Sequence, residues 1–221
     1  MKNFVVSSFS FVLLLSLMCS ISVQQSHADA RVAETAEETQ PLKSGDQAPA
    51  FTVRDVNNVE YNFDPDRLSK PAVIITFRGG WCPYCNMHLS ELRTVVPEIS
   101  ALGVDVIFLS GDRPELLFAS LKQDTQDDIA ELDYQIYSDA NAEAAIALRT
   151  AFKTTEGMTD WLEEKGHDYA DSSIGRHGIL GVPAVYAIDQ SGLIRFDFVE
   201  ANYKVRLPAE ELLAVAAEIA Q

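Results

Sequence analysis

The chain has 221 residues, with 33 acidic and 17 basic side chains, so its formal net charge at pH 7 is -16. Hydrophobic residues make up 47% of the sequence, which is ordinary for a folded domain and argues against extended disorder. A polyanion is repelled by phosphate surfaces, so we expect neither nucleic acid nor an anionic membrane as a partner. Three cysteines are too few for a multi-disulfide scaffold.

The first thirty residues have the pattern of an export signal. Lys2 precedes an apolar stretch from Phe4 to Met18, and the small-x-small sequence Ala28-Asp29-Ala30 follows. This order is typical of a secretory signal peptide. We predict a signal peptide at residues 1–30, cut after Ala30, with a cut after Ala28 fitting nearly as well. The alternative is an uncleaved N-terminal membrane anchor.

An exported protein, periplasmic or extracellular, is therefore expected. Residues 31–44 are polar and acidic without an apolar period, and they predict a flexible leader before one domain at residues 45–221. Loss of the signal peptide removes Cys19 and leaves Cys82 and Cys85. A pair only three positions apart gains little from closing a loop, so it is not expected to be a structural staple.

Short apolar runs rich in branched residues predict the strands. The first two flank Asn57-Asn58 and the last two flank the turn sequence Asp189-Gln190-Ser191-Gly192, so each pair predicts a hairpin. The continuous apolar runs between them suit strands that are buried on both faces of a sheet. The expected strands are Ala50–Arg54, Val59–Phe63, Pro71–Phe77, Val104–Ser110, Tyr134–Tyr137, Ala184–Ile188 and Leu193–Val199.

Helices are expected between the strands. In the longest of them, residues 83–102, apolar positions recur every three or four residues, and Pro97 is expected to kink its last turns. The polar segment 153–178 interrupts the alternation as an insertion with one short helix around Trp161. The whole pattern predicts an α/β fold with a mixed sheet flanked by helices. The other expected helices are Pro114–Lys122, Ala142–Phe152 and Pro208–Ala220.

The sequence Arg78-Gly-Gly-Trp-Cys-Pro-Tyr-Cys85 joins a buried strand to the long helix. The first turn of a helix carries unpaired N–H groups and the positive end of the helix dipole, which stabilise a thiolate. Cys82 at this position is expected to have a lowered pKa. Cys85 lies one turn on, so the two sulfurs can form and break a short disulfide. Pro83 suits the first helical position.

Metal binding is the main alternative use of a Cys-x-x-Cys pair. A structural zinc site needs four ligands, and only His88 lies near Cys82 and Cys85 in the sequence. Covalent haem attachment requires a histidine where Asn86 stands. We therefore expect no cofactor and retain a Cys/His metal-binding module as a minor alternative.

Several segments together resemble the thioredoxin fold and, within it, the peroxiredoxin-like alkyl hydroperoxide reductase/thiol-specific antioxidant family. They are GDQAPAF at 45–51, FRGGWCPYC at 77–85 and GVPAVYAIDQSGLIRF with ANYKVRLPAEELLA between 181 and 214. The resemblance covers residues 44–218 and is weakest in the insertion. It implies that Val182-Pro183 forms a cis-proline loop facing the dithiol, and that Trp81 packs beside the cysteines.

The chain departs from the family pattern at one position that matters. Typical members carry Pro-x-x-x-Thr/Ser-x-x-Cys, in which the hydroxyl orients the peroxide. Counting back from Cys85 places Cys82 at the hydroxyl position, and counting back from Cys82 places Gly79 there. Either way the hydroxyl is missing, which brings the chain closer to dithiol–disulfide oxidoreductases.

The resemblance implies a thiol peroxidase with a peroxide substrate, a thioredoxin-type protein reductant and a possible homodimer. The alternative is an exported oxidoreductase that acts on protein disulfides. Position in the family pattern favours Cys85 as the attacking cysteine. Local physical chemistry favours Cys82, which is expected to be the more exposed sulfur at the helix start, and we predict that Cys82 attacks and Cys85 resolves. Arg78 is a candidate for holding a thiolate or a peroxide oxygen. Weaker candidates near the site are Arg149, Arg176, His167 and His177.

Overall fold

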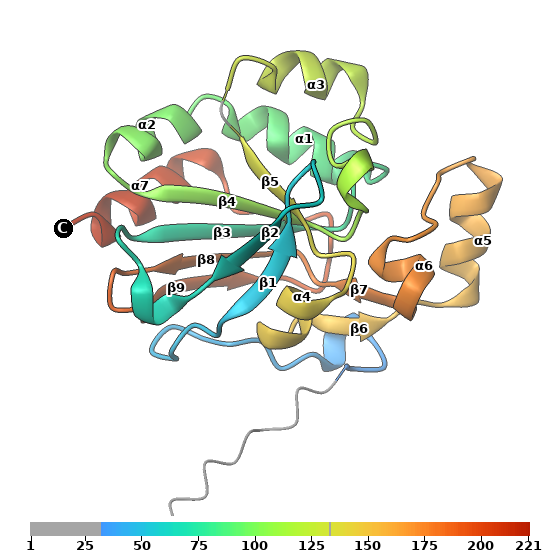
Figure 1. Cartoon of the computed structure of the whole chain (residues 1–221), viewed down its shortest axis with the longest axis horizontal. Coiled ribbons are helices and arrows are strands. Elements are labelled where there is room, and N and C mark those ends of the chain that lie inside the picture. Colours follow the sequence, from blue (N-terminus) through green and yellow to red (C-terminus); the bar gives the residue numbers. More distant parts are fainter. Residues whose placement is uncertain (1–31, 133) are drawn as a thin grey trace, which may run out of the picture.

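The computed structural model describes residues 32–132 and 134–221, so the expected signal peptide lies outside the described residues. A seven-stranded mixed sheet in the order β2-β1-β5-β4-β3-β8-β9 forms the centre of the molecule (Figure 1). Its strands are β1 (Phe51–Arg54), β2 (Glu60–Phe63), β3 (Ala72–Phe77), β4 (Asp105–Ser110), β5 (Gln135–Ser138), β8 (Ala184–Ile188) and β9 (Ile194–Val199). All seven expected strands are confirmed to within a residue or two at their ends.

The middle of the sheet is parallel and its edges are antiparallel. Strands β3, β4 and β5 run in the same direction, whereas β8 pairs with β3 in the opposite direction and β9 follows β8 in a hairpin. The β1–β2 hairpin joins at the other edge through β5. Parallel strands are buried on both faces, which explains the continuous apolar runs in β3 and β4.

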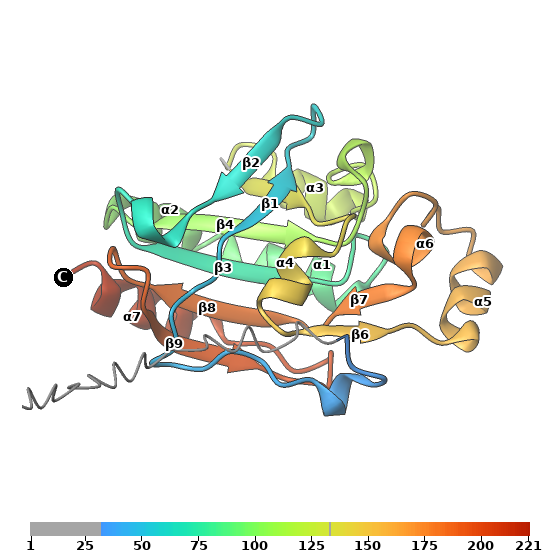
Figure 2. The same ribbon diagram turned by 60° about the horizontal axis from the view of Figure 1, so that its bottom comes forward.

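Alternate side chains of β3 point into two separate cores, as the pleat of a strand requires. Val73 and Ile75 pack with helices α1 (Pro83–Leu92), α2 (Val96–Ala101) and α7 (Ala209–Ile219). Ile74 packs on the opposite face with α4 (Glu143–Ala147) and the β1–β2 hairpin. Figure 2 shows α4 and α1 on opposite sides of the sheet. Helix α7 confirms the predicted C-terminal helix.

The long helix expected over residues 83–102 is two helices. Helix α1 ends at Leu92 and α2 begins at Val96, with Pro97 in its first turn. Proline has no N–H to donate and its ring collides with the preceding turn, so it is accepted where a helix starts and not inside one. The predicted kink is therefore a break.

Two other expected helices are wrong in extent. At 114–122 only the 3-10 turn Pro114–Leu116 forms, and the helix that follows is α3 (Gln123–Ile129). At 142–152 helix α4 stops at Ala147, because Arg149 adopts the left-handed conformation (φ 59°) that ends a helix. The chain then enters a short strand, β6 (Ala151–Lys153).

The insertion forms a small subdomain at the end of the sheet where the dithiol lies. Strand β6 pairs with β7 (Ile179–Gly181) as a separate two-stranded sheet, and helices α5 (Glu156–Glu164) and α6 (Ser173–His177) lie between them in sequence. The orange helices α5 and α6 stand beside the main body in Figure 1. The expected helix around Trp161 is confirmed as α5.

The N-terminal segment (residues 32–44) is held against the domain, so the expectation of a flexible leader is wrong over these residues. Ala33 is buried and bridges Phe152, with its N–H donating to the carbonyl of Ala151 at 2.9 Å. Leu42 is buried in the α4-side core, and its N–H donates to the carbonyl of Leu148. The sequence did not predict the burial of Ala33 and Leu42, because single apolar residues in a polar segment form no periodic pattern.

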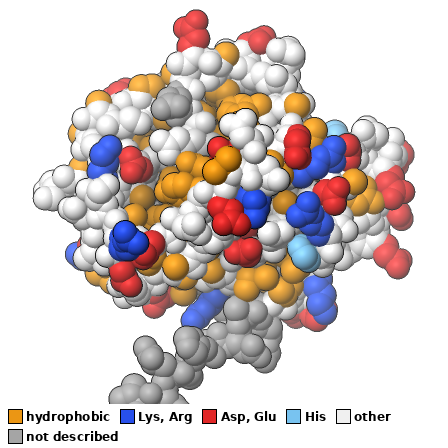
Figure 3. Space-filling model, in the orientation of Figure 1, with side chains coloured by type: hydrophobic (Ala, Val, Ile, Leu, Met, Phe, Trp, Pro, Cys, Tyr) orange, Lys and Arg blue, Asp and Glu red, His pale blue; other side chains and the backbone are white. Residues whose placement is uncertain are grey.

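Surface charge is mixed on the face of the molecule drawn in Figure 3. On the face drawn in Figure 3, acidic side chains alternate with basic and apolar ones, so the acidic excess does not gather in one patch. Among residues 32–132 and 134–221, no helix has the length and apolar character needed to cross a membrane.

Candidate active site

The two cysteines lie at the start of α1, after the turn that follows β3. Strand β3 ends at Phe77, and Cys82 is the N-cap of α1 with φ -84° and ψ 116°. Pro83 occupies the first helical position, and the Cys85 N–H donates to the Cys82 carbonyl at 3.1 Å. The predicted placement of the dithiol at a helix start is confirmed.

Both sulfur-bearing side chains are buried. Cys82 is 0% exposed and Cys85 is 1% exposed, and both are free cysteines. The expectation that Cys82 is the more exposed sulfur is therefore wrong. Helix starts are accessible on an isolated helix, but here the loop before α7 and the insertion pack around this one.

The pKa values of the two thiols are shifted in opposite directions. A hydrogen bond from Cys85, aided by the charges of Arg78 and Arg206, lowers the pKa of Cys82 from 9.0 to about 6 against the effect of burial. Burial raises the pKa of Cys85, and the hydrogen bond that it gives to Cys82 raises it further. At neutral pH the pair therefore consists of a Cys82 thiolate and a Cys85 thiol that donates to it.

Arg206 is the site residue that the sequence did not reveal. It lies in the loop between β9 and α7, and its Nη2 donates to the sulfur of Cys85 at 3.6 Å. Its Nη1 donates to the carbonyls of Tyr203 and Val205, and its Nε is buried without a hydrogen-bond partner among the described residues. The only signal was its place inside the matched C-terminal segment.

Arg78 is held between aromatic rings. Its guanidinium carbon is 4.2 Å from the ring centre of Tyr203 and 4.9 Å from that of Trp81. Its Nη2 also contacts the sulfur of Met158 at 3.5 Å. Stacking of this kind fixes a guanidinium without neutralising it, so its charge remains available to Cys82.

Aromatic side chains cover the site. Trp81 is buried and meets the edge of Trp161, on α5, at 6.1 Å between ring centres, so it packs rather than faces solvent. Tyr84 meets Tyr203 edge-on at 5.7 Å. The insertion and the loop before α7 thus close over the dithiol from two sides.

The peptide bond before Pro183 is trans, which corrects the predicted cis bond. The chain passes through Val182 in an extended path that is fixed on both sides: its N–H donates to the Thr150 carbonyl, and its carbonyl accepts from the Thr76 hydroxyl at 3.1 Å. The same hydroxyl accepts from the Ala184 N–H at 2.9 Å. Trans is the lower-energy form, and these contacts give no reason to leave it.

Val182 and Pro183 nevertheless lie beside the site. They line an open cleft of about 250 Å³ together with Arg78, Tyr203 and residues 34–37 of the N-terminal segment. Arg78, whose charge lowers the pKa of Cys82, lines the cleft together with Tyr203, which contacts Arg78. The two cysteines are buried and do not line it.

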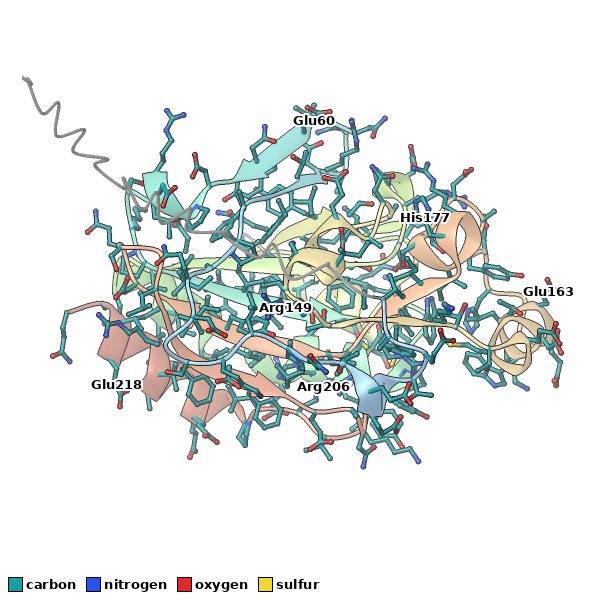
Figure 4. The ribbon with its side chains drawn as sticks, turned by 90° about the horizontal axis from the view of Figure 1, so that it is seen from below. Glu60, Arg149, Glu163, His177, Arg206 and Glu218 are labelled. Atoms are coloured by element: carbon teal, nitrogen blue, oxygen red, sulfur yellow. The ribbon has the colours of Figure 1, made fainter. Side chains whose placement is uncertain are left out.

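The remaining candidates are not at the sulfurs. Arg176 bonds to Asn141 and pairs with Asp171, and His167 lies against the Trp161 ring. In Figure 4, His177 lies on α6, apart from the loop that carries Arg206. Arg149 ends α4.

His88 does not complete a metal site. It is buried with its Nε2 3.1 Å from the Leu207 carbonyl, and burial, with the nearby charge of Arg206, lowers its pKa to about 4. In the described part of the chain, no three His, Cys, Asp or Glu side chains are placed to share a metal ion. The metal-binding alternative has no support in these residues.

The decisive comparison is with family models. The model of the AhpC/TSA family matches residues 44–197, and these include the dithiol, the insertion and the Val182-Pro183 loop. The chain belongs to the AhpC/TSA family. The resemblance drawn from the sequence is confirmed, and the fold is that of the peroxiredoxin-like branch.

Curated relatives of this AhpC/TSA protein include the peroxiredoxin Bcp of Escherichia coli K12. It is 32% identical over 77 residues, which is 35% of this chain and 49% of the relative. The same figures hold for a putative peroxiredoxin bcp of Shigella flexneri. The chain therefore spans about half the length of the curated relatives it matches.

Solved structures share the fold across most of the chain. Reduced Prx3 of Vibrio vulnificus in complex with hydrogen peroxide is 18% identical, covers 79% of this chain and 99% of its own, and has a TM-score of 0.59. BcpB of Mycobacterium tuberculosis is 15% identical, covers 80% and 98%, and has a TM-score of 0.54. At these identities the likeness concerns the fold.

Proposed function

We propose that this AhpC/TSA protein is a thiol peroxidase that reduces hydrogen peroxide or organic hydroperoxides through a cycle of Cys82 and Cys85. The observation that carries the proposal is the division of acidity in the pair: one sulfur with a pKa of about 6 beside one whose pKa is raised. A nucleophile must be ionised and a resolving thiol must keep its proton until it is needed.

The reaction balances on these two sulfurs. The Cys82 thiolate attacks one peroxide oxygen, the O–O bond breaks, and the leaving hydroxide or alkoxide takes up a proton. Cys82 becomes a sulfenic acid. Cys85 then loses its proton and attacks the Cys82 sulfur, the Cys82–Cys85 disulfide forms, and water leaves. A dithiol reductant restores both thiols and is itself oxidised to a disulfide.

Two arginines supply the donors for this chemistry. The family's hydroxyl is missing, but the positive charges of Arg78 and Arg206 both lower the pKa of Cys82. A guanidinium donates several hydrogen bonds in a fixed plane, and it stabilises the negative charge that develops on the leaving oxygen. The Nε of Arg206, which is buried without a hydrogen-bond partner among the described residues, is proposed as a further donor to this oxygen.

Export is part of the proposal. The signal peptide expected at residues 1–30 would deliver the protein to the periplasm or the medium, where a dithiol rests as a disulfide unless a dedicated reductant supplies electrons. We therefore propose a thioredoxin-type protein as the reductant, and a homodimer as an assembly to test. Intact-mass measurement on protein from its native host decides whether residues 1–30 are removed.

A second function, exchange with protein disulfides, is favoured by one observation. The dithiol caps a helix as Cys-x-x-Cys, and the Pro183 loop lines an open cleft next to Arg78. An extended chain in that cleft would contact Arg78 and the Pro183 loop. A peroxidase reacts with a small oxidant, whereas an enzyme of the second kind must bind a polypeptide that carries the disulfide.

Turnover assays separate the two functions. The full chain without residues 1–30 is assayed with hydrogen peroxide, cumene hydroperoxide and, separately, the disulfides of insulin. Peroxide turnover that is abolished in Cys82→Ser, with a sulfenic acid trapped on Cys82 in Cys85→Ser, supports the peroxidase. Insulin reduction without peroxide turnover supports the alternative and overturns the proposal.

A further inference from the structure

Two buried polar side chains hold the backbone of Gly80, the residue that precedes Trp81 and Cys82. Asp112 and Asn86 are each 2% exposed. The carboxylate of Asp112 accepts the Gly80 N–H at 2.7 Å, and the side-chain amide of Asn86 donates to the Gly80 carbonyl at 2.7 Å. One residue is thus held from both sides of its backbone.

Hydrogen bonds from neighbouring side chains hold Asp112 in this position. It follows β4, and the same carboxylate oxygen that accepts from Gly80 also accepts from the hydroxyls of Ser110 at 3.1 Å and Ser120 at 2.9 Å. Three donors converge on one oxygen. A buried carboxylate with this many partners has a fixed orientation. These hydrogen bonds replace those it would make to water, so the loss of one costs free energy.

Asn86 extends the hold to the nucleophile. Its amide nitrogen also donates to the Cys82 carbonyl at 2.9 Å, and its oxygen accepts the Lys122 N–H at 2.7 Å. Asn86 lies near the start of α1, and its side chain joins this helix to the Gly79-Gly80 turn that precedes it. The loop around Lys122 belongs to the same hydrogen-bond network.

The turn itself has no spare room. A side-chain carbon at Gly80 would lie 2.0 Å from the Ser120 hydroxyl and 2.7 Å from the Leu121 nitrogen. At Gly79, where φ is 149°, it would lie 2.3 Å from the Trp81 ring nitrogen. Both glycines are therefore required by close approach, and the turn is seated against the segment that carries Ser120.

From these contacts we infer that Asp112 and Asn86 are positioning residues for Cys82. They fix the backbone of Gly80, and this fixes Cys82 at the N-cap of α1, where the Cys85 thiol donates to its sulfur. They act through the backbone and touch neither the peroxide nor the sulfur. The inference rests on the proposed role of Cys82, but its readouts need no peroxide turnover.

The first test measures the pKa of Cys82 by thiolate absorbance near 240 nm in reduced variants. Asp112→Leu removes the acceptor for the Gly80 N–H, and the pKa of Cys82 is expected to rise by about one unit, a tenfold fall in its ionisation constant. Asp112→Asn keeps an oxygen for that N–H and is expected to restore the pKa to near the wild-type value. Asn86→Leu removes both donors and is expected to behave like Asp112→Leu.

This pair of substitutions separates positioning from charge. If Asp112 acted by its charge, both neutral variants would lower the pKa of Cys82 together, and the inference would be overturned. Asp139→Asn is the matched control: Asp139 is also buried, but it accepts from the N–H groups of Ala144 and Ala145 on α4. It is expected to leave the Cys82 pKa unchanged. An unchanged pKa in Asp112→Leu and Asn86→Leu would equally refute the inference.

A second measurement uses the unmodified protein and does not depend on the folding of any variant. The Gly80 N–H lies in a turn, where amide hydrogens exchange fast, yet it is expected to exchange as slowly as the strand amides of β4 because its acceptor is buried. Fast exchange of this amide in the reduced protein would show that the turn is not held, and would overturn the inference. Loss of peroxidase activity with slow Gly80 exchange and a low Cys82 pKa would count against the proposed function alone.

Discussion

The guanidinium of Arg206 donates to the sulfur of Cys85 at 3.6 Å, although 121 positions separate the two residues in the chain. The contact joins the start of α1 to the loop before α7. It places a positive charge beside the pair of sulfurs, and this charge lowers the pKa of Cys82. The acidity of the dithiol therefore depends on a residue from the opposite end of the domain.

Removal of this charge tests that dependence. In Arg206→Gln the pKa of Cys82 is expected to rise by a fraction of a unit, because an opposite charge near a thiolate lowers its pKa and Arg206 acts on Cys82 more weakly than Arg78 does. Thiolate absorbance near 240 nm against pH measures the change. The matched control is Arg176→Gln, whose partners are Asn141 and Asp171. Equal pKa values of Cys82 in the two variants would show that Arg206 does not affect the ionisation of Cys82.

The pH profile tests the roles of the two cysteines. The pKa of Cys82 is lowered to about 6, so its reactive thiolate is present above that pH and is lost as the pH falls through it. Peroxide reduction is expected to be level from about pH 7 upward and to fall tenfold per unit below about pH 5. Cys85→Ser should keep the low ionisation and Cys82→Ser should lose it. A sulfenic acid trapped on Cys85 in Cys82→Ser would reverse the assignment.

The cover over the dithiol is the subject of a third prediction. Tyr203 contacts both Tyr84 and Arg78, so Tyr203→Ala is expected to open the loop before α7. Modification of Cys82 by a bulky aromatic disulfide reagent should become several-fold faster, because access as well as ionisation limits a buried thiolate. Tyr61→Ala is the matched control, since Tyr61 on β2 stacks on Tyr137 of β5. Equal rates in the two variants would show that Tyr203 is not the cover.

A fourth prediction concerns the N-terminal segment. A chain that begins at residue 43 lacks the burial of Ala33 and Leu42 and their backbone hydrogen bonds to β6 and Leu148. Its free energy of unfolding is expected to fall by about 1–3 kcal/mol relative to a chain that begins at residue 31. Urea denaturation of both chains measures the difference. Identical midpoints would restore the description of these residues as a flexible leader.

Local sequence determined the strands and the placement of the nucleophile. The apolar runs of β3 and β4 and the turn residues of the two hairpins are properties of neighbouring residues, and so is a proline after Cys82 at the start of a helix. Their energies arise within a few positions of the chain, and a pattern over that length reports them. The break at Pro97 was also present in the sequence, but one proline does not tell a kink from a new helix.

Tertiary structure alone decided which groups surround the sulfurs. Arg206, Asp112 and the N-terminal segment reach the site or its cleft across long stretches of chain, and nothing in their own neighbourhoods marks them for it. Burial of Cys82 has the same origin, since a helix start is exposed until other elements pack over it. The dithiol itself is thus a local feature. Its acidity, cover and fixed position come from contacts that exist only after the chain has folded, because Coulomb and hydrogen-bond energies depend on distance in space.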